Sequence, residues 1–375
     1  MNIEIRKVSS SKDRKIFLTL PYEIYKGDPL WVPPLLPQAR RTISPEDGVF
    51  FKRGEADFFI AYQNGKPAGT ICAAVDPPTN SKRKRADCVI GFYECVNNSE
   101  VSKALFNTAS RWAAERGLSY LFGPFNLDYE NAYGVLVSGR DRPPTLMCGH
   151  SPPYYLSQFE SYGFEKARGD NLAFAVAVDP DSPGQKRLSR LAKVARSRGE
   201  ATIRPVDLDD LDGEIDRIHK LLVRSLAHLE GSVPWRRDAL EAMLLPLKDI
   251  VDPDLVIFAE VDGKTVGWFP GMPNLNELFI RLNGLRRRWN YLGLIGGLKR
   301  KTKCLAVKSL LVLPEYWNTG VSILLFDEMA KRAYEKGYEW IDLSLTAEDN
   351  PQTPAIADRL GAVEYKRYRV FLKKL

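Results

Sequence analysis

Residues 57–70 read DFFIAYQNGKPAGT, and residues 255–268 read LVIFAEVDGKTVGW. In each stretch, an Asn-Gly or Asp-Gly pair stands between two runs of mostly apolar residues, which is a strong short-range signal for a β-hairpin. The two stretches match at an offset of 198 residues, with Gly65, Lys66 and Gly69 against Gly263, Lys264 and Gly267. The sequence therefore predicts the same hairpin twice.

A second pair of matching segments follows the hairpins, at an offset of 220 residues. Each segment has the apolar spacing of an amphipathic helix, ends at a glycine and leads into a further strand. The matching positions are Leu105, Phe106, Ala113, Glu115, Gly117 and Tyr120 against Leu325, Phe326, Ala333, Glu335, Gly337 and Trp340. We therefore expect two copies of one α/β unit, and the difference between the offsets indicates an insertion in the second copy.

The length and composition fit two such units. The chain has 375 residues, 44% of them hydrophobic, which is enough to bury the cores of two domains. We expect an N-terminal unit over residues 1–180, a basic linker helix over 181–200 and a C-terminal unit over 201–375, with the insertion at 273–303. The predicted fold class is α/β (α+β), in which each unit has a mixed central sheet flanked by helices.

Targeting and metal signals are weak. Met1 to Lys7 carry charges where a signal peptide needs apolar residues, and no run of about 18 apolar residues occurs, so a cytoplasmic protein is expected. The five cysteines have no C-x-x-C spacing, and His150, His219 and His228 are interpreted as surface or capping histidines. Neither a metal site nor a disulfide framework is predicted.

One turn carries a signal for anion binding. Residues 314–322 read PEYWNTGVS and stand between a predicted strand and an amphipathic helix. A tight turn followed by a helix N-terminus directs several backbone N–H groups to one point, and Gly320 lets the backbone approach a ligand closely. The pattern predicts a site for a pyrophosphate.

Residues 311–325, LVLPEYWNTGVSILL, resemble the coenzyme A loop of the GNAT acyltransferase superfamily. In that family the turn usually reads Arg/Gln-x-x-Gly-x-Gly/Ala, and its amides hold the pyrophosphate of coenzyme A. Here Trp317 replaces the first polar residue, Gly320 is retained and Ser322 takes the last small position. The resemblance implies two tandem GNAT-like domains and coenzyme A or acyl-CoA as co-substrate. The cofactor-binding residues that it implies are Leu311, Val312, Leu313, Trp317, Asn318, Thr319, Gly320, Val321, Ser322 and Asn350.

The corresponding loop of the first copy, residues 96–101, reads VNNSEV and lacks the glycines. We therefore expect a degenerate N-terminal copy that binds no coenzyme A. An arrangement in which one copy keeps the co-substrate and the other shapes the acceptor site occurs among N-acyltransferases of this superfamily.

The resemblance also implies a reaction, in which an amine attacks an acyl thioester. The family uses a glutamate or a water-linked acid near its fourth and fifth strands as the base, and strand amides near Leu311 to Leu313 are expected to stabilise the oxyanion. Ala357 stands where a tyrosine general acid is often found. The candidate bases are Glu315, Glu348 and Asp349, and the candidate acids are Tyr316, Tyr365 and Tyr368.

The net charge of +7 is concentrated in one segment, Arg281 to Lys303, which has eight basic residues and no acidic residue. Its middle, Trp289 to Leu298, is apolar but too short and glycine-rich to span a bilayer. Three alternatives stay open for this segment: a lid over acyl-CoA, a membrane-surface contact that would make the protein peripheral to a membrane, and a solvated loop. Nucleic acid is not an expected partner, because few aromatic residues are interleaved with the charges.

The first hypothesis is an acyl-CoA-dependent N-acyltransferase, for which the apolar and basic insertion favours a long acyl chain or a lipid-like amine acceptor. The alternative is a non-catalytic GNAT-like protein that binds a ligand or partner between its two copies. The residues at 317 and 357, which depart from the family pattern, favour this alternative.

Overall fold

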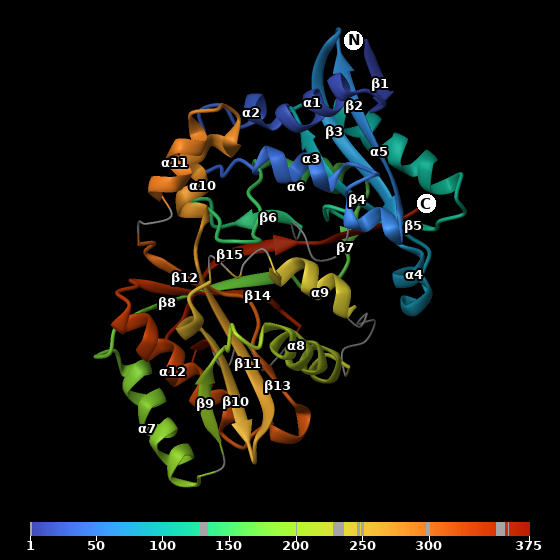
Figure 1. The fold of residues 1–375 in the computed structure, drawn as a ribbon. Coiled ribbons are helices and arrows are strands. Elements are labelled where there is room, and N and C mark those ends of the chain that lie inside the picture. The colour runs from blue at the N-terminus through green and yellow to red at the C-terminus, as the bar shows by residue number, and fades with distance from the viewer. Residues whose placement is uncertain are drawn as a thin grey trace.

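The computed structural model describes residues 2–127, 134–199, 201–227, 236–245, 248, 251–297, 301–349, 357–358 and 360–375. Two mixed β-sheets form the framework, each with helices packed against it (Figure 1). The blue N-terminal elements gather in one part of the molecule, and most of the yellow and orange elements gather in the other.

The first sheet has seven strands in the order β1-β2-β3-β4-β5-β16-β7. Its strands are β1 (Ile3–Lys7), β2 (Glu55–Gln63), β3 (Lys66–Val75), β4 (Asp87–Cys95), β5 (Tyr120–Gly123), β7 (Glu165–Lys166) and β16 (Phe371–Lys374). The helices of this part are α1 (Ser11–Thr19), α2 (Pro21–Ile24), α3 (Leu36–Thr42), α4 (Pro77–Arg83), α5 (Ser99–Ala114) and α6 (Tyr154–Ser161).

The second sheet has the order β6-β15-β8-β14-β12-β11-β10-β9, and the short strand β13 also pairs with β11. Its strands are β6 (Val135–Ser138), β8 (Asn171–Ala177), β9 (Thr202–Pro205), β10 (Val256–Val261), β11 (Lys264–Pro273), β12 (Cys304–Val307), β13 (Leu311–Val312), β14 (Trp340–Ala347) and β15 (Val363–Arg369). The helices are α7 (Pro183–Ser197), α8 (Leu211–Ser225), α9 (Arg237–Leu244), α10 (Asn276–Leu282), α11 (Asn290–Gly297) and α12 (Val321–Glu335).

The two predicted hairpins are confirmed. β2 and β3 are joined at Asn64 and Gly65, with φ angles of 50° and 79°, and β10 and β11 are joined at Asp262 and Gly263, with φ angles of 49° and 72°. Both pairs have the left-handed backbone that a two-residue hairpin needs, which Asn, Asp and Gly tolerate best. The repeat in the sequence is therefore a repeat in the structure.

The repeat extends to the order of the strands. In each sheet four strands pair antiparallel, and the fourth then pairs in parallel with a fifth, β4 with β5 and β12 with β14. The sixth place in each sheet is filled from the other half of the chain: β16 lies between β5 and β7, and β8 lies between β14 and β15. The exchanged strands cross the division that the sequence predicts between residues 1–180 and 201–375.

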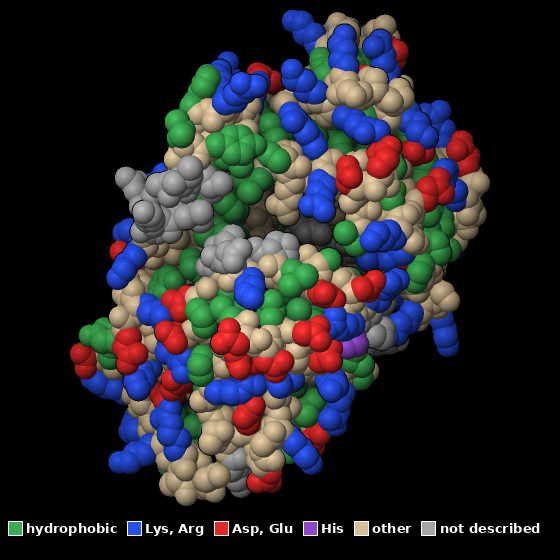
Figure 2. All heavy atoms as spheres, viewed as in Figure 1, with side chains coloured by type: hydrophobic (Ala, Val, Ile, Leu, Met, Phe, Trp, Pro, Cys, Tyr) green, Lys and Arg blue, Asp and Glu red, His purple; other side chains and the backbone are tan. Residues whose placement is uncertain are grey.

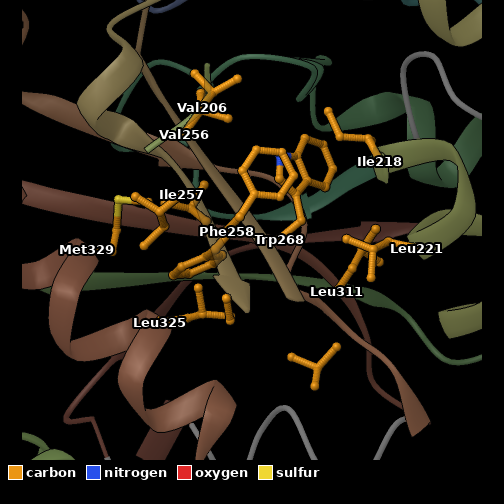
Figure 3. Packing of buried hydrophobic residues seen from close by; sticks show 14 of the residues in the cluster. Val206, Ile218, Leu221, Val256, Ile257, Phe258, Trp268, Leu311, Leu325 and Met329 are labelled. Carbon is orange, nitrogen blue, oxygen red and sulfur yellow. The ribbon is translucent and has the colours of Figure 1, made fainter. Parts of the chain in front are cut away.

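The core of the second sheet lies between helices on its two faces. Ile218 and Leu221 of α8 and Leu325 and Met329 of α12 pack against β10 and β11, as Figure 3 shows. Residues at helical spacing along α12 are buried because one face of the helix meets the sheet, as the amphipathic pattern predicts. This packing fixes the N-terminus of α12 relative to the strands.

The segment between β11 and β12 is the predicted insertion. Residues 274–303, here called the arm, contain α10, a short 3-10 helix (Asn283–Leu285) and α11. In the part of the chain that the structure describes, no helix combines the length and the apolar character that crossing a bilayer requires.

Candidate functional site

The second sheet opens between two neighbouring strands. β12 and β14 pair in parallel as far as Val307 opposite Leu343. Beyond that point, β13 pairs with β11 and the rest of β14 pairs with β8. The strands therefore separate. This separation, here called the split, leaves one edge of β13 with no neighbouring strand among the residues that the structure describes. Such an edge can receive an extended ligand through its backbone groups.

Polar side chains gather where the split begins. The Nζ atom of Lys308 lies 2.7 Å from Asp342 Oδ2, 2.6 Å from Ser344 Oγ and 3.2 Å from Thr145 Oγ1. The Tyr365 hydroxyl donates to Asp342 Oδ1 at 2.8 Å. Cys148 completes this group, the base cluster, which consists of Thr145, Cys148, Lys308, Asp342, Ser344 and Tyr365.

The base cluster is shielded from water. Asp342 and Thr145 have no exposed surface, and the side chain of Lys308 is 13% exposed. Burial lowers the pKa of Lys308, but the charges of Cys148 and Asp342 outweigh burial and raise that pKa overall. Lys308 and Asp342 therefore form an ion pair at neutral pH. The ammonium of Lys308 has three donors, and three oxygen atoms and the sulfur of Cys148 lie within hydrogen-bond reach of it, so Lys308 holds the site in place.

The N-terminus of α12 is open. Gly320 is its N-cap with φ of 97°, and no side chain makes a capping hydrogen bond there. In the first repeat, by contrast, Asn98 caps the corresponding helix α5 and accepts from the amides of Glu100 at 2.9 Å and Val101 at 3.3 Å. The first-turn amides of α12 thus suit a phosphate group, whereas Asn98 already accepts from two of those of α5.

Trp317 has a structural position in the turn. Its indole Nε1 donates to the carbonyl of Val312 at 2.9 Å, and the hydroxyl of Ser225 donates to the same carbonyl at 3.1 Å. Since the N–H and C=O of one strand residue point to the same side, the Val312 amide also faces away from β11. The amide of Leu313 was expected to help stabilise an oxyanion. In the structure it donates to the carbonyl of Val266 and so points toward β11.

The three predicted bases lie elsewhere. Glu315 is an exposed residue paired with Arg224 at 2.6 Å. Asp349 is exposed and accepts from the amide of Gly169 at 2.6 Å. Hydrogen bonds from Arg367, Lys166 and the amide of Asp170 lower the pKa of Glu348 to about 2. A carboxylate with so low a pKa is a poor base, so Glu348 is not favoured. Glu315 and Asp349 are exposed and lie outside the base cluster.

The predicted acids divide. Tyr365 belongs to the base cluster, and burial raises its pKa. Tyr368 is fully buried and donates to the carbonyl of Gly149 at 3.0 Å, and Tyr316 packs at the edge of the apolar core. Asn350 lies outside the described residues. Ala357 packs with Leu172 and Phe174 of β8. Of the predicted catalytic residues, the structure brings Tyr365 alone to the split.

The first repeat has a similar separation of strands, but its own chain fills it. β4 pairs with β5 only over residues 87–89 and 120–122. Further along, the amide of Phe125 donates to Ile90 at 2.8 Å, and Asn126 Oδ1 accepts from the amide of Phe92 at 2.8 Å. These contacts occupy the edge that a ligand would need. Together with the capped α5, they distinguish the first repeat from the second.

Of the residues in the base cluster, the sequence predicts only Tyr365 as a site residue. Lys308 and Asp342 are charged residues within apolar strand sequence, a signal that could have identified them, because buried charges need partners. No comparable signal exists for Thr145, Cys148 or Ser344. The neighbouring His150 is also not a surface residue, since its side chain is 4% exposed and its Nε2 atom lies 2.7 Å from Asp28 Oδ2.

Two further features bear on the chemistry. Side chains alternate along β14, so Ile341 and Leu343 face away from the base cluster and line a small apolar pocket between β8, α7 and α12. Within the described residues, no three His, Cys, Asp or Glu side chains gather as a metal ion would require.

Residues 217–362 match the model of the Acetyltransferase (GNAT) family. Two relatives align over 382 residues. The chain is 28% identical to the bacterial ceramide synthase of Caulobacter vibrioides, covering 100% of this chain and 98% of the relative. It is 26% identical to Protein YghO of Escherichia coli, covering 99% and 95%.

Solved structures with the same fold cover both repeats. A tandem GNAT protein from the clavulanic acid biosynthesis pathway superposes with a TM-score of 0.58 at 12% identity, covering 100% of this chain and 98% of the other. A GCN5-related N-acetyltransferase from Sphaerobacter thermophilus gives 0.55 at 14% identity, covering 99% and 95%.

Proposed function

We propose that the protein is an N-acyltransferase that uses acyl-CoA, because residues 217–362 match the GNAT family model and the chain has the fold of a tandem GNAT protein. The observation that carries the proposal is the difference between the two repeats. The second repeat has an open split and an uncapped helix N-terminus, whereas the first has a filled split and a capped helix.

The parts of the site suit the parts of an acyl-CoA. The first-turn amides of α12, those of Val321 and Ser322 among them, would hold the pyrophosphate, as the helix dipole favours. At the outward edge of β13, the Val312 amide would donate to a carbonyl of the pantetheine arm, since the Val312 carbonyl already accepts from Trp317 and Ser225. The acyl thioester would then lie near the base cluster, which excludes water from the bottom of the split.

The reaction balances without a further reactant. The nitrogen of a neutral amine forms a bond to the thioester carbonyl carbon, and the carbon–sulfur bond breaks. The proton that the amine gives up leaves with the thiolate, so the products are an amide and free thiol. Holding the amine and the thioester together at the end of the split supplies the proximity that this bimolecular step needs.

We further propose that both substrates carry long chains. A ceramide is an amide between a fatty acid and a long-chain amino alcohol, and the ceramide synthase of Caulobacter vibrioides aligns with the whole of this chain. The arm adds an exposed apolar surface, including Trp289 and Leu292, that suits a lipid-like substrate. A long-chain amine is therefore the proposed acceptor.

A competition between chain lengths tests this proposal. The purified protein would receive an equimolar mixture of acetyl-CoA, octanoyl-CoA and palmitoyl-CoA with sphinganine or with ethanolamine, and the amides would be identified by mass spectrometry. The expected product is N-palmitoyl sphinganine. Binding of coenzyme A without any amide would favour the non-catalytic alternative, and amides of ethanolamine alone would overturn the lipid acceptor.

A further inference from the structure

The end of the arm presents large apolar side chains to solvent. Leu292 is 73% exposed, Trp289 is 61% exposed and Tyr291 is 45% exposed, all within four residues. Figure 2 shows hydrophobic side chains gathered over α10 and α11, beside the place where the surface is hollowed between the two parts of the molecule. Exposing such groups together is unfavourable in water, so a concentration of this kind indicates a contact surface.

Positive charge surrounds these side chains. Between positions 281 and 303 the sequence has eight basic residues and no acidic one. The Arg287 guanidinium lies 4.9 Å from the centre of the Trp289 ring, which places charge directly beside the apolar surface. One of the charges, Lys303, is paired with Glu339. Within the described part of positions 281–303, the exposed basic side chains are Arg281, Arg286, Arg287, Arg288, Lys301 and Lys303.

The root of the arm is fixed on the first repeat. The Tyr22 hydroxyl donates to the carbonyl of Asn283 at 3.2 Å, and the Arg286 guanidinium lies 4.9 Å from the centre of the Tyr22 ring. Leu282 is buried, and a Cβ at Gly284 would lie 2.0 Å from the Tyr22 hydroxyl. The arm therefore has a packed root and an exposed tip.

We propose that the tip of the arm, Trp289 to Leu292 with the arginines Arg286 to Arg288, docks on a bilayer surface that contains anionic headgroups. Trp and Tyr favour the boundary between headgroups and acyl chains, and basic residues are attracted to an anionic leaflet. The eight-residue helix α11 is about 12 Å long, which suits an interfacial position. A nucleic acid would match the charge but would leave Leu292 unused.

This inference stands on the surface itself and does not depend on acyl transfer. It also deepens the proposed function, because a lipid acceptor in the bilayer would lie next to the hollow between the two repeats (Figure 2). The test therefore uses no acyl-CoA, so failed docking and failed acyl transfer give different results.

Sedimentation with lipid vesicles tests the docking. Wild-type protein should sediment with vesicles of phosphatidylcholine and phosphatidylglycerol, and much less with phosphatidylcholine alone. The variant W289S/L292S should bind at least tenfold more weakly. R287S/R288S should bind about thirtyfold more weakly at low salt. The matched control is Y334S/V363S, which removes an aromatic and an aliphatic side chain of similar exposure elsewhere and should bind like wild type.

A second measurement keeps the proposal testable if the serine variants fail to fold. Brominated lipids should quench the tryptophan fluorescence of the wild type and quench that of W289F, which keeps an aromatic ring, much less. Absence of wild-type sedimentation would overturn the proposal, as would equal weakening in the control. The surface would be assigned to nucleic acid instead if the protein bound a DNA fragment as tightly as vesicles and if W289S/L292S left the binding to DNA unchanged.

Discussion

The Nζ atom of Lys308 lies 2.7 Å from Asp342 Oδ2 at the point where β12 and β14 separate. Asp342 lies within the apolar strand β14 and Lys308 directly follows β12, and both residues also form hydrogen bonds with Ser344 and Thr145. The pair thus closes the bottom of the split with fixed polar groups. Because a buried charge is stable only with its partner, the pair also ties the opening of the sheet to the stability of the second repeat.

Removing one charge should destabilise the protein. We expect K308M to lower the free energy of unfolding by about 3–5 kcal/mol, since it leaves the Asp342 carboxylate buried without its counter-ion. The double variant K308M/D342N should recover part of this loss. Denaturant unfolding measures both, with R224M as a control that breaks an exposed pair and should cost less than about 1 kcal/mol. Equal losses in K308M and the double variant would contradict the pairing.

A carboxylate in the first turn of α12 should exclude the pyrophosphate. Ser322→Asp suits a helix N-terminus and should preserve the fold, but its charge repels phosphate. Gly320 is less suitable, because a Cβ there would lie 2.9 Å from the Cβ of Ala195 in α7. Coenzyme A at about 100 times its Kd should stabilise the wild type by about 2.7 kcal/mol in a thermal unfolding assay. The shift should vanish in S322D.

The corresponding change in the first repeat is the control for that experiment. Ser99→Asp places a carboxylate at the start of α5, which Asn98 already caps. We expect S99D to keep the full shift with coenzyme A. If S99D lost the thermal shift and S322D retained it, coenzyme A would bind to the first repeat, which would contradict the proposed site.

Stability should depend on pH through Glu94 of β4. Burial raises the pKa of Glu94 from 4.5 to about 7, although the Tyr155 hydroxyl donates to its carboxyl at 2.7 Å. The folded state therefore binds more protons than the unfolded state between these values. The contribution of Glu94 is complete below about pH 4.5 and is lost as pH rises through about 7, which lowers the free energy of unfolding by roughly 3 kcal/mol. Unfolding of E94Q measured from pH 5 to 8 should lack this decline, and parallel curves would contradict the assignment.

The carboxylates that the sequence favours as bases should be dispensable for the reaction. Glu315 and Glu348 are held by arginines outside the base cluster, so E315Q and E348Q remove surface ion pairs. We expect each variant to retain acyl transfer within about threefold at pH 7. A loss of a hundredfold in kcat, with normal binding of coenzyme A, would restore that glutamate as a catalytic group.

Local patterns predict much of this fold. Both hairpins follow from Asn64-Gly65 and Asp262-Gly263, and α12 follows from its apolar spacing and from Gly320. The exchange of β8 and β16 has no local signal, because it joins segments far apart in the sequence, as in the pairing of Val176 with Ile341. Sheet pairing of this kind is decided by packing, which short-range propensity does not report.

The candidate site likewise has a part that local sequence features predict and a part that they do not. The turn at Trp317 to Ser322 was visible because its glycine and its position before a helix are local features. From the sequence, Trp317 replaces the polar residue that the family pattern has at this position. In the structure, its indole Nε1 donates a hydrogen bond to the carbonyl of Val312. Thr145 and Lys308 meet only in the folded chain, so their contact could not be read from spacing.

The most direct test of the central claim is a product balance. Wild-type protein, palmitoyl-CoA and sphinganine would be incubated together, and the amide and the free coenzyme A thiol would be quantified in the same sample. Acyl transfer to an amine should give one amide for each thiol released, with both products reduced at least tenfold in S322D and unchanged in S99D. Thiol release without amide, or neither product under conditions where coenzyme A binds, would contradict it.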